Sequence, residues 1–226
     1  MTRSFTLFYR QIQREWLLQI RDPRTILQAV LFFIMIAVFF PLSLPADKTL
    51  LRLVTPGIIW ISLLLAMLLS AVYFFQQDYE DGILEQWLIS SYPLTMYVLA
   101  KLTVHWLLIV MPILLFCPLL ALLFHLSLGE TVALIESILI GSPAILGLCG
   151  LASAFNAGIQ QKGILMALIL LPLTIPIMIF GSGILVLVMQ GLPFDAYLAI
   201  LAAMSILVLS FLPFAIAVVL RINLVD

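Results

Sequence analysis

The sequence predicts an all-α membrane protein with six transmembrane helices, and three observations lead to this class. Of its 226 residues, 65% are hydrophobic and 9% are charged, a composition foreign to a water-soluble domain. The apolar residues form six runs, each reaching or exceeding the roughly 20 residues that cross about 30 Å of hydrocarbon. The runs lack the alternation of barrel strands, and lipid offers no partner to backbone groups, so the runs must be helices. The runs cover residues 25–44, 54–75, 102–126, 131–155, 163–189 and 196–220.

Residues 1–24 are predicted to form an amphipathic helix on the membrane surface. Steps of about 100° per residue place five large apolar side chains on one face and four arginines within about 40° on the opposite face. The cations should therefore point toward lipid phosphates. This stretch has no small-residue cleavage site, so we expect no cleavable signal peptide. Its role is either simple anchoring or, in addition, contact with a partner. The apolar face holds Phe5, Phe8, Ile12, Trp16 and Ile20, and the arginines are Arg3, Arg10, Arg14 and Arg21.

The distribution of lysine and arginine predicts the orientation. Six spans put both termini on one side, and cations beside short loops are retained in the cytoplasm. Eight cations lie on the side of the termini and two on the other, so both termini are expected to be cytoplasmic. The eight are Arg3, Arg10, Arg14, Arg21, Arg24, Lys101, Lys162 and Arg221, and the two are Lys48 and Arg52.

The loop at residues 76–101, between the second and third runs, carries the most information. Its four carboxylates, Asp78, Glu80, Asp81 and Glu85, would be repelled by anionic headgroups, which favours a protein partner. After Gly82, apolar side chains recur at helical spacing, and Pro93 suits the start of a new helix. This pattern is typical of a helix that enters a partner's groove, although the helix could instead fold back on its own bundle. The apolar ridge consists of Ile83, Leu84, Trp87 and Leu88.

Two motifs stand out in the sequence. The first reads Asp-Tyr-Glu-Asp-Gly-x-Leu-Glu-Gln at residues 78–86, followed by Ser91-x-Pro93 and Ala100-Lys101. The second is the apolar stretch at residues 168–181, with Pro172 and Pro176. Both motifs resemble the CcmB family, the membrane subunit of the ABC-type complex of bacterial cytochrome c maturation, and the similarity covers essentially the whole chain. The chain departs from the family pattern at Tyr92, which is inserted where the family often has a Ser-Pro pair. The insertion shifts the start of the next helix but does not remove the motif.

The resemblance implies an ABC-2-type permease with an interfacial helix at 1–24, a six-helix domain at 25–226 and a cytoplasmic coupling loop at 76–101, in the bacterial inner membrane. Its implied partners are two copies of a CcmA-type ATPase, a second copy of this chain, CcmC-type and CcmD-type membrane subunits and a CcmE-type haem chaperone. Gly82 would turn the backbone, and Trp87 would be the anchor in a groove of the ATPase. The implied contacts are Asp78, Glu80, Asp81, Gly82, Leu84, Glu85, Trp87 and Leu88.

The chain itself is not expected to catalyse a reaction or to hold a cofactor. It contains no Gly-x-x-x-x-Gly-Lys-Ser/Thr phosphate loop, so any ATP chemistry belongs on another subunit. The resemblance implies that haem is handled by the complex. Cys117 and Cys149 lie inside predicted spans, where packing is the ordinary role of a thiol. The net charge of −1 argues against nucleic acid as a ligand.

Few polar groups interrupt the spans. Glu136 and His105 are candidate contacts for a substrate or a partner; the alternatives are a hydrated carboxyl and a packed imidazole. His105 and His125 lie about 30 Å apart along one helix and cannot share a metal. In the fifth run, two prolines and two glycines (Gly181 and Gly183) predict a bend or re-entry, and the resemblance suggests a span that ends near Gly181.

The leading hypothesis is a subunit that couples a partner's ATP hydrolysis to haem export or to release of a haem-loaded CcmE-type chaperone. Release is favoured, because no pair of haem ligands and no wide polar path is evident. An ABC-2-type permease for a lipid-linked glycan or a hydrophobic drug is the alternative. An ion-coupled transporter would show midplane charges and an internal repeat, and an intramembrane enzyme would show clustered polar groups deep in several spans. Neither pattern is found.

Overall fold

The computed structural model describes residues 2–45, 47–90, 92–157 and 164–225, and within these ranges the chain is helical with no strand. Among the described residues, six helices are long and apolar enough to cross a membrane, which confirms the predicted all-α class. They are α2 (Arg24–Ser43), α3 (Lys48–Ala71), α6 (Leu94–Leu123), α7 (Leu128–Asn156), α8 (Ile164–Met189) and α9 (Asp195–Val225). The other three are α1 (Thr2–Arg21), α4 (Gln76–Glu80) and α5 (Ile83–Ile89).

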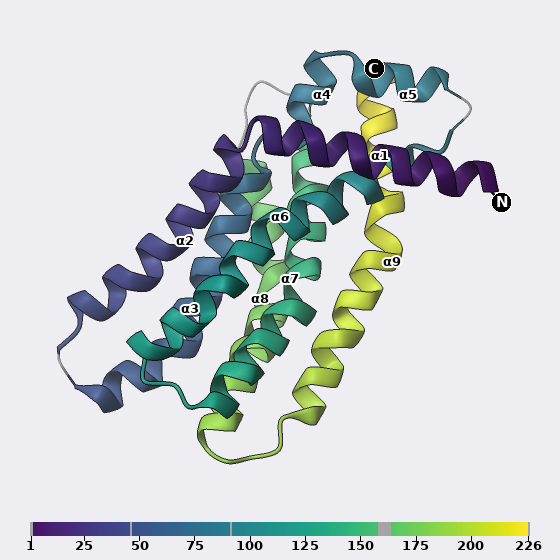
Figure 1. Cartoon of the computed structure of the whole chain (residues 1–226). Coiled ribbons are helices and arrows are strands. Elements are labelled where there is room, and N and C mark those ends of the chain that lie inside the picture. Colours follow the sequence, from purple (N-terminus) through teal and green to yellow (C-terminus); the bar gives the residue numbers. More distant parts are fainter. Residues whose placement is uncertain (1, 46, 91, 158–163, 226) are drawn as a thin grey trace.

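The six long helices form an elongated bundle, and α1, α4 and α5 gather at one end of it (Figure 1). This end also holds the C-terminal residues of α9 and is called the terminal end below. Helix α1 lies across the bundle and packs on α6. Helix α7 is central, because it contacts α3, α6, α8 and α9. Its small residues, among them Gly141, Gly147 and Gly150, let these neighbours approach closely.

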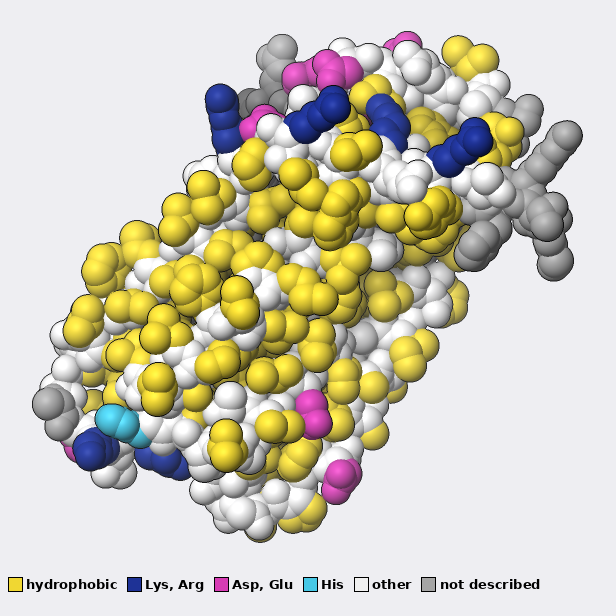
Figure 2. Space-filling view, in the orientation of Figure 1, with side chains coloured by type: hydrophobic (Ala, Val, Ile, Leu, Met, Phe, Trp, Pro, Cys, Tyr) yellow, Lys and Arg dark blue, Asp and Glu magenta, His cyan; other side chains and the backbone are white. Residues whose placement is uncertain are grey.

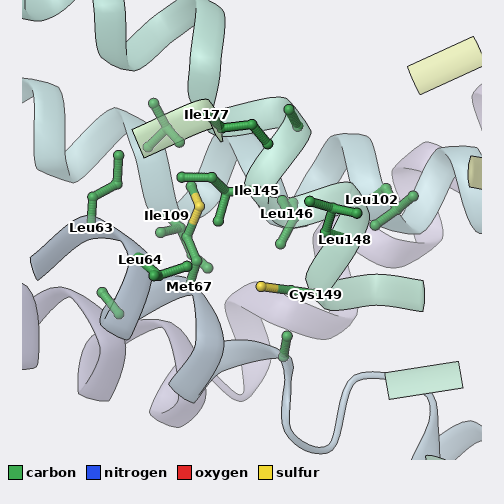
Figure 3. Packing of buried hydrophobic residues seen from close by; sticks show 14 of the residues in the cluster. Leu63, Leu64, Met67, Leu102, Ile109, Ile145, Leu146, Leu148, Cys149 and Ile177 are labelled. Carbon is green, nitrogen blue, oxygen red and sulfur yellow. The ribbon is translucent and has the colours of Figure 1, made fainter. Parts of the chain in front are cut away.

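The interior of the bundle is apolar. Figure 3 shows side chains of α3, α6, α7 and α8 meeting there, among them Met67, Ile109 and Ile145. Trp60 of α3 is the largest fully buried side chain. An added Cβ would come within 2.6 Å of the Trp60 ring at Gly141 and within 2.2 Å at Gly181. The indole thus occupies the space that two glycines leave open, and it joins α3 to α7 and α8.

Helix α8 differs from its sequence prediction. It runs unbroken through two prolines, Pro172 and Pro176, to Met189, so the predicted end of the span near Gly181 is wrong. The glycines serve packing instead of a break: Gly181 faces Trp60, and at Gly183 an added Cβ would come within 2.7 Å of the Tyr197 ring. A membrane helix tolerates proline because its neighbours compensate for the lost backbone bond. Lys162, one of the eight cations that predict the orientation, lies outside the described residues.

Polar contacts fix the end of the bundle opposite the terminal end. Arg52 of α3 forms an ion pair with Glu130 and donates to the His125 carbonyl oxygen at 2.8 Å. Glu130 also forms a capping box with Ser127, in which the Ser127 N–H donates to the carboxylate at 2.7 Å. One arginine thus holds α3 to the turn between α6 and α7, and a capping box of this type stabilises the start of α7.

Candidate coupling site at the terminal end

Gly82 sets the geometry of the segment that the sequence singled out. Its φ of +69° lies in the left-handed region, which a glycine enters without the steric cost of a Cβ. The chain turns there from α4 into α5, and α6 begins directly after Pro93. The turn at Gly82, the short helix after it and the restart at Pro93 are confirmed. Helix α6, however, begins well before residue 102, so Lys101 belongs to a span and not to the loop.

A buried ion pair joins α4 to α6. Lys101 Nζ and the Tyr97 hydroxyl both donate to Oδ2 of Asp78. The three residues are 8%, 0% and 9% exposed, respectively. Because removal of one partner from such a pair leaves an uncompensated buried charge, the pair holds α4 in one position on α6. Buried charged groups are stable only when they are paired or hydrogen-bonded, and Tyr97 supplies one further hydrogen bond to the carboxylate.

Glu15 of α1 lies beside this ion pair and lines the same cavity as Lys101 and Asp78. It is 3% exposed and accepts a 2.9 Å hydrogen bond from Nε2 of Gln11. Burial raises the pKa of the Glu15 carboxyl above its usual value, Lys101 opposes this shift, and Asp78 adds to it. The sequence analysis missed Glu15. The signal was present in the spacing of Gln11, Glu15 and Gln19, which places three polar side chains on one face, and this is the face that α1 turns to α6.

His105 lies one turn after Lys101 on α6. It is 4% exposed, its Nδ1 lies 2.9 Å from the Gln19 side-chain oxygen, and its ring centroid lies 4.7 Å from that of Phe74. Its Nε2 is buried and has no hydrogen-bond partner among the described residues. The imidazole borders a cavity of about 380 Å³ that Glu15, Lys101 and Asp78 also line. His105 is therefore a packed interior side chain beside a polar cavity.

Glu136, the second candidate contact, is not near this cavity. It lies in the first half of α7, which begins at the end opposite the terminal end, whereas His105 lies in the first half of α6. Glu136 is half-buried. The structure therefore does not bring Glu136 and His105 into one site.

The residues predicted to meet a partner divide into three groups. Glu80, Asp81 and Glu85 are exposed. Trp87 and Leu88 are half-buried, and the Trp87 ring centroid lies 5.6 Å from that of Tyr97. Asp78 and Leu84 are buried by the chain's own helices.

Two parts of the sequence prediction therefore need correction. Asp78 was expected to contact a partner, but Lys101 of the same chain already pairs with it. Leu84 was expected to lie in a partner's groove, but it is fully enclosed by its own bundle. The physical reason is that α5 is too short to be stable alone, so one of its faces must pack on α6 and α9. The carboxylates remain on the outer face.

A second link ties α4 to the ends of α7 and α9. The Tyr79 hydroxyl donates to the Asn223 carbonyl oxygen at 3.4 Å. The Asn223 side chain donates to the carbonyl oxygens of Ala154 and Ala157 at 2.9 and 3.0 Å. Asn223 therefore supplies side-chain donors to two carbonyl groups at the C-terminus of α7, where intrahelical donors run out. Through Asp78 and Tyr79, α4 is tied to three long helices.

Comparison with known proteins agrees with this architecture. The model of the CcmB protein family matches residues 6–223. The chain belongs to the CcmB family. It is 39% identical to heme exporter protein B of Pseudomonas aeruginosa over 99% of both chains. It is 38% identical to heme exporter protein B of Haemophilus influenzae and 34% identical to that of Escherichia coli, in each case over 96% of this chain and 99% of the relative.

Proposed function

We propose that this CcmB family member is the membrane subunit of an ABC-type complex for haem handling in cytochrome c maturation, driven by a separate CcmA-type ATPase. Family membership and the name of the relatives, heme exporter protein B, support the haem-handling part. The ATP-dependent part rests on one observation. An outer row of carboxylates (Glu80, Asp81, Glu85) lies on short helices whose inner face is fixed to the spans.

This arrangement suits the transmission of force. A basic surface of the ATPase would attract the three exposed carboxylates. Movement of α4 and α5 would then pass to α6 through Asp78 and Lys101, and to α7 and α9 through Tyr79 and Asn223. Packed helices of this kind switch as rigid bodies. In this proposal two copies of the chain are held by two ATPases, with CcmC-type and CcmD-type subunits beside them.

The proposed orientation places the terminal end in the cytoplasm of a bacterial inner membrane. Arg10, Arg14, Arg21, Arg24 and Arg221 lie in helices at this end, and the positive-inside rule supports that side. An ATPase that uses cytoplasmic ATP could then reach α5.

We favour release of a haem-loaded CcmE-type chaperone over passage of haem through this chain. The described centre of the bundle is closed by apolar side chains, with Trp60 wedged between α3, α7 and α8. The polar cavity that His105 borders lies at the terminal end and does not continue into this core. ATP-driven movement of the bundle could act on a neighbouring haem-bearing subunit without a path for haem through the chain.

The test is co-purification of this chain with the ATPase and its neighbours in mild detergent, together with ATPase activity and cytochrome content. Glu85→Lys should weaken co-purification and uncouple ATP hydrolysis, while insertion into the membrane is unchanged. Asp195→Lys makes the same charge change at an exposed position at the opposite end and is the control. Glu85→Lys should abolish c-type cytochromes and spare b-type cytochromes, whereas the Asp195→Lys control should keep both. Normal c-type cytochromes in a strain that lacks the ATPase would sink the proposal.

A further inference from the structure

A groove lies between α1 and α5 at the terminal end. Its volume is about 410 Å³. Helix α1 supplies Leu7, Arg10 and Arg14 to its wall, and Trp87 and Tyr92 lie across from them. The groove is distinct from the polar cavity beside His105, although Arg14 and Ile83 border both.

The groove is built to receive an anion. Arg10 and Arg14 are one helical turn apart and so share a face of α1. They are the only charged residues among those described that line it; the others are apolar or carry neutral polar groups, such as Gln86 and Ser90. The Glu15 carboxylate lies 3.9 Å from Arg14 and accepts a hydrogen bond from Gln11, which lines the groove, but Glu15 itself does not line it. The groove therefore has a net positive charge.

The position of α1 matches the level of lipid headgroups. In Figure 2, basic side chains follow α1 in a row along the edge of the apolar surface, and acidic side chains lie beyond this row. Helix α1 also exposes Tyr9, Trp16 and Ile20, which suit the boundary between hydrocarbon and water. The groove thus opens where the phosphates of a surrounding bilayer would lie.

We propose that the groove between α1 and α5 binds the headgroup of an anionic phospholipid, with its phosphate between Arg10 and Arg14. Planar guanidinium groups bind phosphate oxygens in pairs. The acyl chains would lie over the apolar face that α1 exposes. Because α1 and α5 form opposite walls, the bound lipid would bridge them and hold α5 in place.

A phospholipid is favoured over an acidic segment of a partner protein. A protein segment would approach from the aqueous side, where the exposed carboxylates Glu80, Asp81 and Glu85 repel it. A lipid would enter from the apolar side, directly beside the arginines.

The experiment is native mass spectrometry of the full chain in detergent, with phosphatidylglycerol or phosphatidylcholine added. We expect wild type to prefer phosphatidylglycerol by more than about 5-fold, since each cation near a lipid surface contributes roughly that factor. Arg10→Gln with Arg14→Gln should abolish the preference, and lysine at both positions should restore part of it. Arg24→Gln with Arg221→Gln removes the same charge from exposed positions outside the groove and should retain the preference. The unfolding midpoint of each variant verifies folding.

Three results would overturn the proposal. The first is an unchanged preference in Arg10→Gln with Arg14→Gln. The second is an equal loss in the control pair, which would indicate a diffuse charge effect. The third is displacement of the preference by millimolar inorganic phosphate, which would indicate a site for the free ion. If Arg10→Gln with Arg14→Gln keeps the lipid preference but no longer co-purifies with the ATPase in mild detergent, this first result means that the groove is a protein-docking surface instead.

Discussion

Lys101 on α6 and Asp78 on α4 form a buried ion pair at the point where the outer helices meet the spans. Tyr97 shares the same carboxylate oxygen, and the buried Glu15 carboxylate brings α1 to the same cluster. The Lys101 ammonium thus pairs with α4 and lies close enough to influence the Glu15 carboxylate of α1 electrostatically. These two interactions make Lys101 the most informative position to change.

Lys101→Met should destabilise the protein by about 3–5 kcal/mol, because it leaves the Asp78 carboxylate buried without a counter-ion. Thermal unfolding in detergent measures this change. The double variant Asp78→Asn with Lys101→Met should recover part of the loss, since no buried charge of the pair remains. Equal midpoints for wild type and the single variant would show that α4 is held by its apolar contacts alone.

Glu15→Gln should change how stability depends on pH. The pKa of Glu15 is raised in the folded chain, so the folded state binds this proton more tightly than the unfolded state does. The contribution of protonated Glu15 to the stability of the fold is therefore fully present below the pKa of the unfolded chain, and it is lost as pH rises through the pKa of the folded chain. We expect Glu15→Gln to gain stability relative to wild type as pH rises from the usual carboxyl pKa through the raised pKa of the folded chain. Unfolding midpoints across this range provide the measurement. A constant difference at every pH would contradict the expectation.

Gly181→Ala should cost about 1–3 kcal/mol, typical of overpacking in a core. Its new Cβ would meet three atoms of the rigid Trp60 ring at 2.2 to 2.5 Å. Gly57→Ala is the control, because nothing lies within 4 Å of the position that its Cβ would occupy. The unfolding midpoint of Gly57→Ala should equal or exceed that of wild type. If both alanines behave alike, Trp60 can move aside.

Asn223→Ala should cost about 1–2 kcal/mol by the loss of two hydrogen bonds to α7. It should also raise amide hydrogen exchange at the C-terminal end of α7. Asn223→Asp should be worse, because a carboxylate cannot donate to the carbonyl groups of Ala154 and Ala157. Tyr79→Phe removes only the 3.4 Å bond to the backbone of Asn223 and should have the smallest effect. Equal exchange in all three variants would refute the link between α4, α7 and α9.

The parts of the fold that depend on local chemistry follow from the sequence. Six spans follow from length and hydropathy, because each helix must satisfy its own backbone in lipid. The turn between α4 and α5 follows from Gly82, and the start of α6 from Pro93, since backbone conformation at these residues is a local property. Resemblance in two motifs was enough to indicate the CcmB family.

The tertiary structure alone decided which side chains face one another. Glu15, Asp78 and Lys101 lie on three different helices, and helical periodicity gives the face that each side chain occupies but not the helix that packs against that face. It placed Leu84 inside the bundle, because a helix of seven residues is stable only when packed. The tertiary structure also kept α8 continuous through Pro172 and Pro176, and the rings of Trp60 and Tyr197 pack against Gly181 and Gly183 in the second half of this helix.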